Sequence, residues 1–237
     1  LYATTVLCDK TGQNQFTIND MIQIADSNDT DMVYDHNNTE HSSAIRAVYV
    51  PTIQKTVVFF ATNFNPEIRQ SYTLTVIYDS QIYMATEALI EVPTIDSVEQ
   101  TEDGGFTGNE KEVKFFYQDN GLVSNFYLEE YNLSFTTLPE YDVIDDSFFQ
   151  GNQMFGLYTN EDMKTNDTLQ FTLHGISETY YNYMNILLGI AGGNGGSPFQ
   201  TPPATVRGNI VNQTNFNNFA LGFFRLSETD TMSYIVE

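Results

Sequence analysis

A strict alternation of apolar and polar side chains, repeated in short segments, constrains the fold of this chain most strongly. The alternation is clearest in residues 72–78, where Tyr72, Leu74 and Val76 alternate with threonines. Because successive side chains of a β-strand point to opposite faces, this period of two predicts a strand with one buried and one solvated face. Antiparallel sheets are typically built from such strands. The pattern therefore predicts a mainly β protein.

Further strand patterns fill the first 92 residues. They lie at residues 2–7, 15–18, 45–50, 56–61, 82–84 and 88–92. Short strands at this spacing are typical of a sandwich of the immunoglobulin or transthyretin type. We therefore predict a β-sandwich domain over residues 1–92.

A second β-rich domain is predicted for residues 93–237. Residues 92–96 have the composition of a hinge, and residues 99–110, which are polar and contain three glycines, are expected to form a flexible stretch. Strand patterns rich in Phe, Tyr and Leu return at residues 113–117, 125–133 and 169–176.

One helix is predicted near residues 177–191. Ser177 can cap its N-terminus, and Glu178 suits the positive end of the helix dipole. One helical face collects Tyr180, Met184, Leu187, Leu188 and Ala191. A stripe of this kind is expected to face the core.

The charge of the chain is strongly negative. Its 237 residues include 31 acidic and nine basic side chains, a formal charge of −22. This charge repels phosphate backbones and anionic lipid surfaces, so nucleic-acid binding and electrostatic membrane binding are excluded. The hydrophobic content of 41% supports a folded core and excludes general disorder.

The single cysteine, Cys8, excludes a disulfide within the chain and a cysteine zinc site. It lies at the end of a strand pattern, where a lone cysteine is expected to be a small core residue. No apolar run is long enough to span a bilayer. The sequence does not begin with Met, so we expect a processed chain whose export signal is not shown, and any membrane attachment must be through an anchor or a partner.

Motifs for nucleophilic, zinc-dependent or nucleotide-dependent catalysis are not found in the sequence, and no cofactor is expected. His36 and His41 lie in a polar stretch without a third metal ligand at a suitable spacing. His174 falls in a strand pattern and is predicted on its solvated face. The carboxylate pairs 129–130 and 145–146 would serve glycoside hydrolysis only if they were held across a cleft, which remains open here.

A calcium site is the metal site that remains to be considered. Asp26, Asn28 and Thr30 alternate like the first ligands of a calcium loop, but an EF-hand needs glycine and glutamate where Asp31 and Asn37 stand. These three residues are therefore candidates for a looser calcium site, not for an EF-hand.

The C-terminal part of the chain contains a distinctive series of motifs. It includes Pro198-Phe199, Gly208-Asn209-Ile210 and residues 220–224, Ala-Leu-Gly-Phe-Phe. Together they resemble a family of Bacteroidetes outer-membrane lipoproteins defined as domain of unknown function four-two-four-nine.

Segments earlier in the chain agree with the same family in the same order. They are residues 72–76, 92–96, 119–121, 125–127 and 145–151, so the resemblance spans about residues 70–226. At 125–127 the chain has Phe126 where the family usually has tyrosine. The positions that match the family motifs, and that we expect to be structural, are Asp119, Asn125, Tyr127, Gly151, Pro198, Gly208, Asn209, Leu221, Gly222 and Phe224.

The resemblance implies location and partners, but no catalytic residue. Members look like lipid-anchored proteins of the outer membrane whose genes commonly accompany TonB-dependent receptors. We therefore expect a non-enzymatic lipoprotein on the extracellular face. Its expected role is that of an accessory or substrate-capturing subunit of a TonB-dependent transporter or an outer-membrane assembly complex. A stand-alone module that binds an extracellular glycan, peptide or metal is the alternative.

Overall fold

The computed structural model describes residues 2–9, 43–50, 55–62, 67–78, 80–105, 108–192 and 205–237. Its strands are β1 (Tyr2–Asp9), β2 (Ser43–Val50), β3 (Lys55–Thr62), β4 (Ser71–Tyr78), β5 (Gln81–Ala88), β6 (Ile95–Gly104), β7 (Glu110–Gln118), β8 (Phe126–Leu133), β9 (Glu140–Asp145), β10 (Gln153–Thr159), β11 (Thr168–Ile176), β12 (Val211–Asn212) and β13 (Leu221–Ile235). One helix, α1, spans Glu178–Gly192. The mainly β fold predicted from the alternation is confirmed.

The chain divides into two compact units. Unit 1 comprises Leu1–Ile90 and Asn182–Glu228, and unit 2 comprises Glu91–Tyr181 and Thr229–Glu237. The predicted boundary at residue 92 lies close to the start of unit 2. The predicted second domain, residues 93–237, is shared between the two units, because residues 182–228 belong to unit 1.

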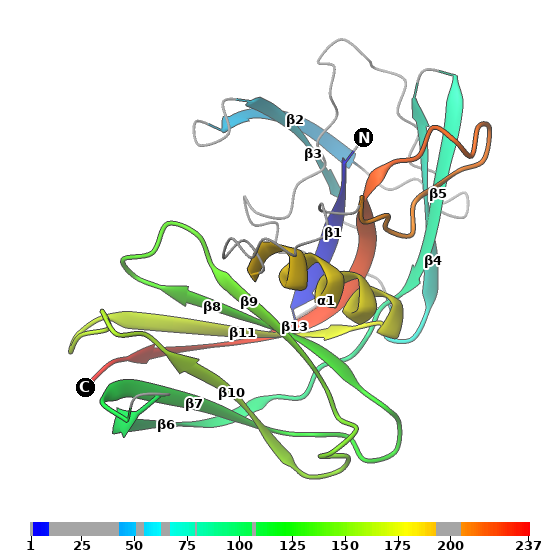
Figure 1. Ribbon diagram of the computed structural model, residues 1–237. Coiled ribbons are helices and arrows are strands. Elements are labelled where there is room, and N and C mark those ends of the chain that lie inside the picture. Colours follow the sequence, from blue (N-terminus) through cyan, green and yellow to red (C-terminus); the bar gives the residue numbers. More distant parts are fainter. Residues whose placement is uncertain are drawn as a thin grey trace, which may run out of the picture. The chain divides into compact units, whose positions relative to one another are not determined.

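Unit 2 contains two sheets that face each other across a common core. One is the three-stranded sheet β10-β7-β6, and the other is formed by β9, β8, β11 and the end of β13 within the five-stranded order β1-β13-β11-β8-β9 (Figure 1). Phe115 of β7 stacks on Phe171 of β11, with ring centroids 4.8 Å apart. Tyr131 of β8 stacks on Tyr158 of β10 at 5.2 Å. Unit 2 is therefore a sandwich of two sheets, and the sandwich predicted for residues 1–92 stays a prediction, because residues 10–42 and other parts of that range lie outside the described residues.

The strand β6 corrects one sequence expectation. Residues 99–110 were predicted to be a flexible stretch after a hinge, yet β6 pairs with β7 from Ile95 to Gly104. Among its side chains only Ile95 is fully buried, so β6 lacks the apolar alternation that marks a strand in a sequence. Its place at the edge of the sheet depends on backbone hydrogen bonds to β7 instead.

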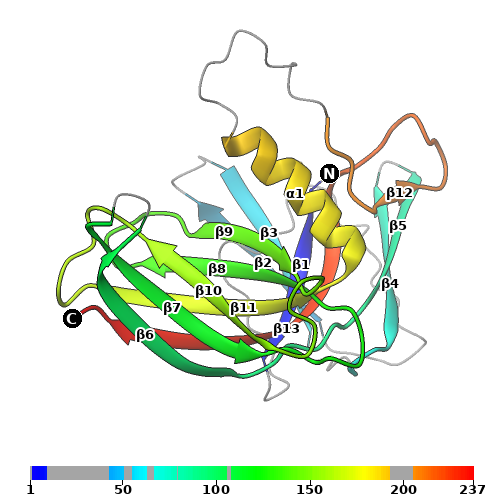
Figure 2. The ribbon, with the colours of Figure 1, turned by 60° about the horizontal axis from the view of Figure 1, so that its bottom comes forward.

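Unit 1 contains two smaller sheets. In one, β5 pairs with β4 and with the short strand β12, whose Val211 and Asn212 pair with Met84 and Tyr83, 127 and 129 residues earlier in the chain (Figure 2). In the other, β2 pairs with β3. Leu74 of β4 is buried and Thr73 beside it is exposed, as the alternation predicts. The described core of this unit contains Leu74, Tyr83, Ala85, Leu89, Ile210, Ala220, Phe224 and Leu226.

The helix begins as predicted. The Oγ atom of Ser177 accepts a hydrogen bond of 3.2 Å from the backbone N–H of Tyr180, which is the contact of an N-cap. Tyr180 is buried, and Met184, Leu187 and Leu188 are half-buried, whereas Ala191 is exposed. Among the described residues, none of the helical structure is long and apolar enough to cross a membrane.

Candidate functional site

Four of the family-motif residues meet at one end of unit 2. Asp119 begins the 119–125 loop between β7 and β8, Asn125 ends this loop, and Tyr127 is the second residue of β8. Gly151 lies in the 146–152 loop between β9 and β10. We call Asp119, Asn125, Tyr127, Gly151 and their neighbour Asp146 the Asp119 cluster.

The Asp119 carboxylate joins the two loops. It is 4% exposed, and its Oδ1 atom accepts a hydrogen bond of 2.8 Å from the Tyr127 hydroxyl. Its Oδ2 atom accepts one of 2.8 Å from the backbone N–H of Gly151. Burial, and then the hydrogen bond to Asp119, raise the pKa of the Tyr127 phenol well above its usual range. Because both carboxylate oxygens have donors, Asp119 acts as a structural acceptor in this cluster.

Asp146 and Asn125 form a second connection between the same loops. The Asn125 N–H donates to Asp146 Oδ2 at 2.8 Å, and the Asp146 N–H donates to the Asn125 carbonyl at 3.2 Å. With its amide oriented so that both its oxygen and its nitrogen are satisfied, the Asn125 side chain donates to the carbonyls of Asn120 and Val123 at 3.1 and 2.9 Å. Burial raises the pKa of Asp146, the Asn125 N–H opposes this, and the nearby Asp119 carboxylate adds to the rise.

The two loops are in backbone contact. A Cβ atom at Gly121 would lie 2.7 Å from the Cα atom of Gly151, which is closer than real side chains approach. Gly151 itself has a φ of 73°, a conformation that glycine adopts without strain. Glycine is therefore required at both positions by the close approach and by the left-handed backbone.

The two loops present four apolar side chains to solvent. Leu122 and Phe148 are 90% and 92% exposed, and Val123 and Phe149 are both 43% exposed. The Gln150 side chain donates to the Val123 carbonyl at 3.2 Å and so links the two loops a third time. We call Leu122, Val123, Phe148 and Phe149 the loop tip. Phe148 and Phe149 lie in the 145–151 segment that resembles the family, whereas Leu122 and Val123 belong to no motif, and the exposure of these four side chains was not predicted.

The remaining described motif residues form a second cluster, in unit 1. The Asn209 side chain makes two hydrogen bonds to the main chain of Phe224. Its Oδ1 atom accepts from the Phe224 N–H at 2.8 Å, and its Nδ2 atom donates to the Phe224 carbonyl at 2.9 Å. Nδ2 also donates to buried Glu87 at 3.2 Å. A Cβ at Gly208 would overlap the carbonyl oxygen of Gly222, whose φ is 102°. Leu221, the first residue of β13, is half-buried. These residues hold β13 in place.

A buried acid lies in the core of unit 2. The Glu129 carboxylate on β8 accepts hydrogen bonds from the hydroxyls of Tyr117 at 3.1 Å and Tyr131 at 2.8 Å. Burial raises the pKa of Glu129 to about 7, and the two hydrogen bonds from the tyrosines partly oppose this shift. Sequence reasoning treated Glu129 as half of an uninformative pair. The sequence feature that could have identified Glu129 as a buried acid is its position between Tyr127 and Tyr131, which share its face of the strand.

His174 is the second correction. It was predicted on a solvated face, but it is 1% exposed and its Nε2 lies 3.1 Å from Glu130 Oε2. His174 and Glu130 both lie on the face of the sheet opposite the face that carries Glu129, because positions 129 and 130 alternate. Glu130 lies on β8 two positions from Leu128, the residue that pairs with His174. The sequence alone does not give this register, so Glu130 could not be identified as the partner of His174.

The other candidate sites are distributed as follows. Asp145 accepts hydrogen bonds from the Ser147 N–H at 2.8 Å and the Tyr181 hydroxyl at 2.9 Å, and the bonds from Ser147 are the main cause that lowers its pKa. Within the described ranges, no three side chains of His, Cys, Asp or Glu are grouped to hold a metal ion. The remaining predicted positions lie outside the described residues: Asp26, Asn28, Thr30, His36, His41 and Pro198.

Comparison with known proteins settles the family. The model of the domain of unknown function DUF4249 matches residues 6–233, a longer stretch than the 70–226 recognised from the motifs. The chain belongs to this family. No curated protein and no solved structure matched the chain. The Asp119 cluster and the Asn209 contacts are therefore built from residues within the DUF4249 match.

Proposed function

We propose that this DUF4249 protein is a non-enzymatic accessory subunit that docks on an outer-membrane β-barrel of the TonB-dependent receptor class. In this proposal it serves as a substrate-capturing part of a transporter or as a part of an assembly complex. A lipid anchor outside the sequence shown would hold it on the extracellular face. The lipoprotein character and the barrel partner follow from the family resemblance described above.

One observation of this chain carries the proposal. The described family-motif residues use their polar side chains on the backbone and side chains of their own unit: Asp119 on Tyr127 and Gly151, and Asn209 on Phe224 and Glu87. A reacting group needs an open side to touch a substrate, whereas these groups have their acceptors filled and hold loops and strands in position. This use of motif residues favours a scaffold that presents a binding surface.

The acidic composition agrees with this role. A body with a charge of −22 gains nothing from an anionic lipid surface, so a stable position beside a membrane would need an anchor and a protein partner.

Affinity purification tests the proposal. The tagged full-length protein is produced in its native host, extracted in a mild detergent and purified, with an unrelated tagged outer-membrane lipoprotein as control. We expect a β-barrel in near-equal amount with this protein and not with the control. Recovery without a barrel, together with a calorimetric signal from a glycan, a peptide or calcium, would favour the stand-alone binding module instead.

A further inference from the structure

The loop tip differs from ordinary exposed apolar residues because its side chains are strongly exposed while the loops that carry them are fixed by hydrogen bonds and a backbone contact. Leu122 and Phe148 have about nine-tenths of their surface in water. A single exposed apolar residue is common, but four on two adjoining loops form a patch of the kind that marks an interaction site. The loops are fixed by the buried Asp119 and Asp146 carboxylates and by the contact of Gly121 with Gly151. A partner would therefore meet side chains on a backbone that is already ordered.

The negative charge is concentrated in the unit that carries the loop tip. Unit 2 contains 20 acidic residues and three lysines, a formal charge of −17 of the total −22. Neither the 119–125 loop nor the 146–152 loop contains Lys or Arg, and each contains a carboxylate of the Asp119 cluster. The carboxylates of Asp119 and Asp146 are themselves buried, so the two loops bring no positive charge to the apolar tip, and the negative charge near it is that of unit 2 as a whole.

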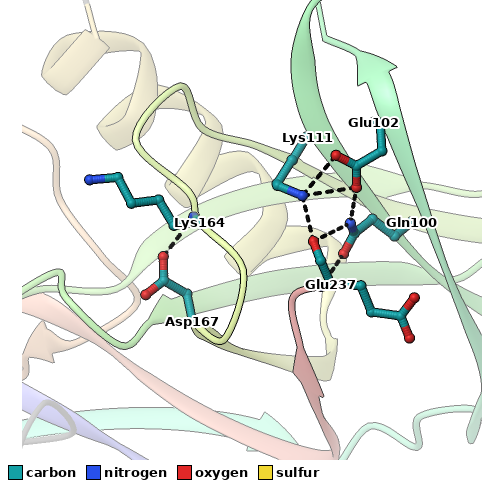
Figure 3. Close-up of polar contacts among 6 residues, drawn as sticks. All are labelled: Gln100, Glu102, Lys111, Lys164, Asp167 and Glu237. Atoms are coloured by element: carbon teal, nitrogen blue, oxygen red, sulfur yellow. Dashed lines mark hydrogen bonds and ion pairs between the residues drawn. The ribbon is translucent and has the colours of Figure 1, made fainter.

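The three lysines of unit 2 lie away from the tip, and two of them pair with carboxylates close by. Lys111, at the start of β7, contacts Glu102 and the main-chain carbonyl of Glu237, next to Gln100 (Figure 3). Lys114 pairs with Glu112 at 2.6 Å. Lys164, in the loop after β10, donates its backbone N–H, and not its ammonium group, to Asp167 Oδ2 at 2.7 Å (Figure 3).

These lysines lie too far from the tip to neutralise the negative charge of unit 2 near it. Lys114 is the nearest along β7, and it precedes Asp119 by five residues, which is about 16 Å along a strand. The Debye length at physiological salt is about 8 Å. The lysines of unit 2 therefore leave its net negative charge near the tip uncancelled.

We infer that the loop tip is a docking surface for a protein partner that presents an apolar recess bordered by lysine or arginine. Exposed Phe and Leu anchors suit the recess, and the carboxylates of unit 2 suit its basic border. The inference deepens the proposed function and rests on it, because it names the surface by which the protein would contact its barrel.

A matched set of variants tests this surface. The double variant Leu122→Ser with Phe148→Ser removes both anchors, and Leu138→Ser removes a 69% exposed leucine in the β8–β9 loop at the opposite end of the sandwich. All three positions are exposed, so we expect an unchanged midpoint of thermal unfolding. In the affinity purification, the double variant should recover about tenfold less barrel or still less, whereas Leu138→Ser should match the wild type.

Two further measurements test the partner itself: salt dependence tests for a basic border, and cross-linking identifies the protein that contacts position 148. Raising the salt from about 0.1 M to about 1 M shortens the Debye length from about 10 Å to about 3 Å, so recovery by the wild type should fall if the recess has a basic border. A photo-cross-linking phenylalanine analogue at position 148 should label the same barrel that copurifies, and the label should disappear when Leu122→Ser is added.

The outcomes separate the two claims. Equal recovery of the barrel by the wild type and the double variant overturns the docking surface and leaves the proposed function standing. Absence of a barrel from the wild-type sample, with no protein labelled from position 148, overturns both. Flotation of the wild type, but not of the double variant, with vesicles of phosphatidylcholine and phosphatidylethanolamine would assign the tip to a lipid surface and overturn the protein partner.

Discussion

At the scale of single residues, Glu129 gives the most specific thermodynamic prediction. Its folded pKa of about 7 lies above the ordinary 4.5, so the folded state binds the proton more tightly than the unfolded chain does. The resulting stabilisation is fully present below about pH 4.5 and is lost as the pH rises through 7. Its magnitude is about 3 kcal/mol.

We therefore predict that Glu129→Gln removes this part of the pH dependence. Urea unfolding of the wild type and the variant at several pH values between 4 and 8 measures it. The stability of the wild type relative to the variant should decrease by about 3 kcal/mol across that range. Parallel curves for the two proteins would mean that Glu129 is not protonated preferentially in the folded state.

Asp119 supplies a second prediction, on the stability of the loops. Asp119→Ala leaves the Tyr127 hydroxyl and the Gly151 N–H without their acceptor, which should cost about 2–4 kcal/mol of unfolding free energy. Asp119→Asn keeps one acceptor oxygen and should cost less. The control is Asp162→Ala in an exposed loop, which should change stability by less than about 0.5 kcal/mol. Equal effects of Asp119→Ala and the control would exclude a structural role for the cluster.

At the scale of elements, Asn209 connects its own segment to β13 through the backbone of Phe224. Asn209→Asp keeps the acceptor for the Phe224 N–H but replaces the amide donor by an oxygen that faces the Phe224 carbonyl and Glu87. Near pH 7 we expect a loss of about 2–4 kcal/mol, decreasing when acid protonates one of the two carboxyls. Denaturant unfolding at two pH values measures this, with exposed Asn217→Asp as the control. A loss that does not decrease in acid would contradict the proposed contacts.

The glycines of the same region give a paired prediction. Gly208→Ala would place a methyl group on the Gly222 carbonyl and should reduce folding yield and the midpoint of thermal unfolding. Gly222→Val should also reduce folding yield because of the φ of 102°. Gly189→Ala, in α1 with open space around the new methyl, should instead stabilise by about 0.5–1 kcal/mol. A Gly208→Ala variant that folds and melts like the wild type would show that the close approach is not needed.

The sequence predicts a strand or helix when its side chains carry the signal, and it does not when the element is held mainly by backbone hydrogen bonds. Strands β4 and β11 carry alternating apolar side chains and could be identified, and the Ser177 cap located α1. Strand β6 could not be identified from the sequence, because its exposed, polar side chains have the composition of a loop. Its pairing with β7 depends on backbone hydrogen bonds. His174 was misplaced because the alternation does not show what covers the second face of a sheet.

The same limit applies to the Asp119 cluster. The motif residues Asp119, Asn125, Tyr127 and Gly151 were identified individually, from the resemblance to the family. The hydrogen bond between Asp119 and Gly151 connects residues 32 positions apart, and the register that brings them together follows from the pairing of β10 with β7. The exposure of Leu122 and Phe148 depends on that packing, so the loop tip could not be predicted from the sequence.

At the scale of the whole molecule, the charge has a distribution that composition does not reveal. Unit 2 has a formal charge of −17 and unit 1 of −5. The unit that carries the loop tip is therefore the more acidic one. In the proposed function this unit meets the partner, and charge complementarity would chiefly increase the rate of association.

The central claim is that the protein works as a stoichiometric subunit of a barrel complex, and native mass spectrometry of the detergent-extracted, affinity-purified sample tests it most directly. We predict a particle whose mass equals that of this protein plus one β-barrel, and which loses the barrel when Leu122 and Phe148 are both replaced by serine. A wild-type particle with the mass of this protein alone, under conditions that preserve a known barrel–lipoprotein complex, would contradict the claim.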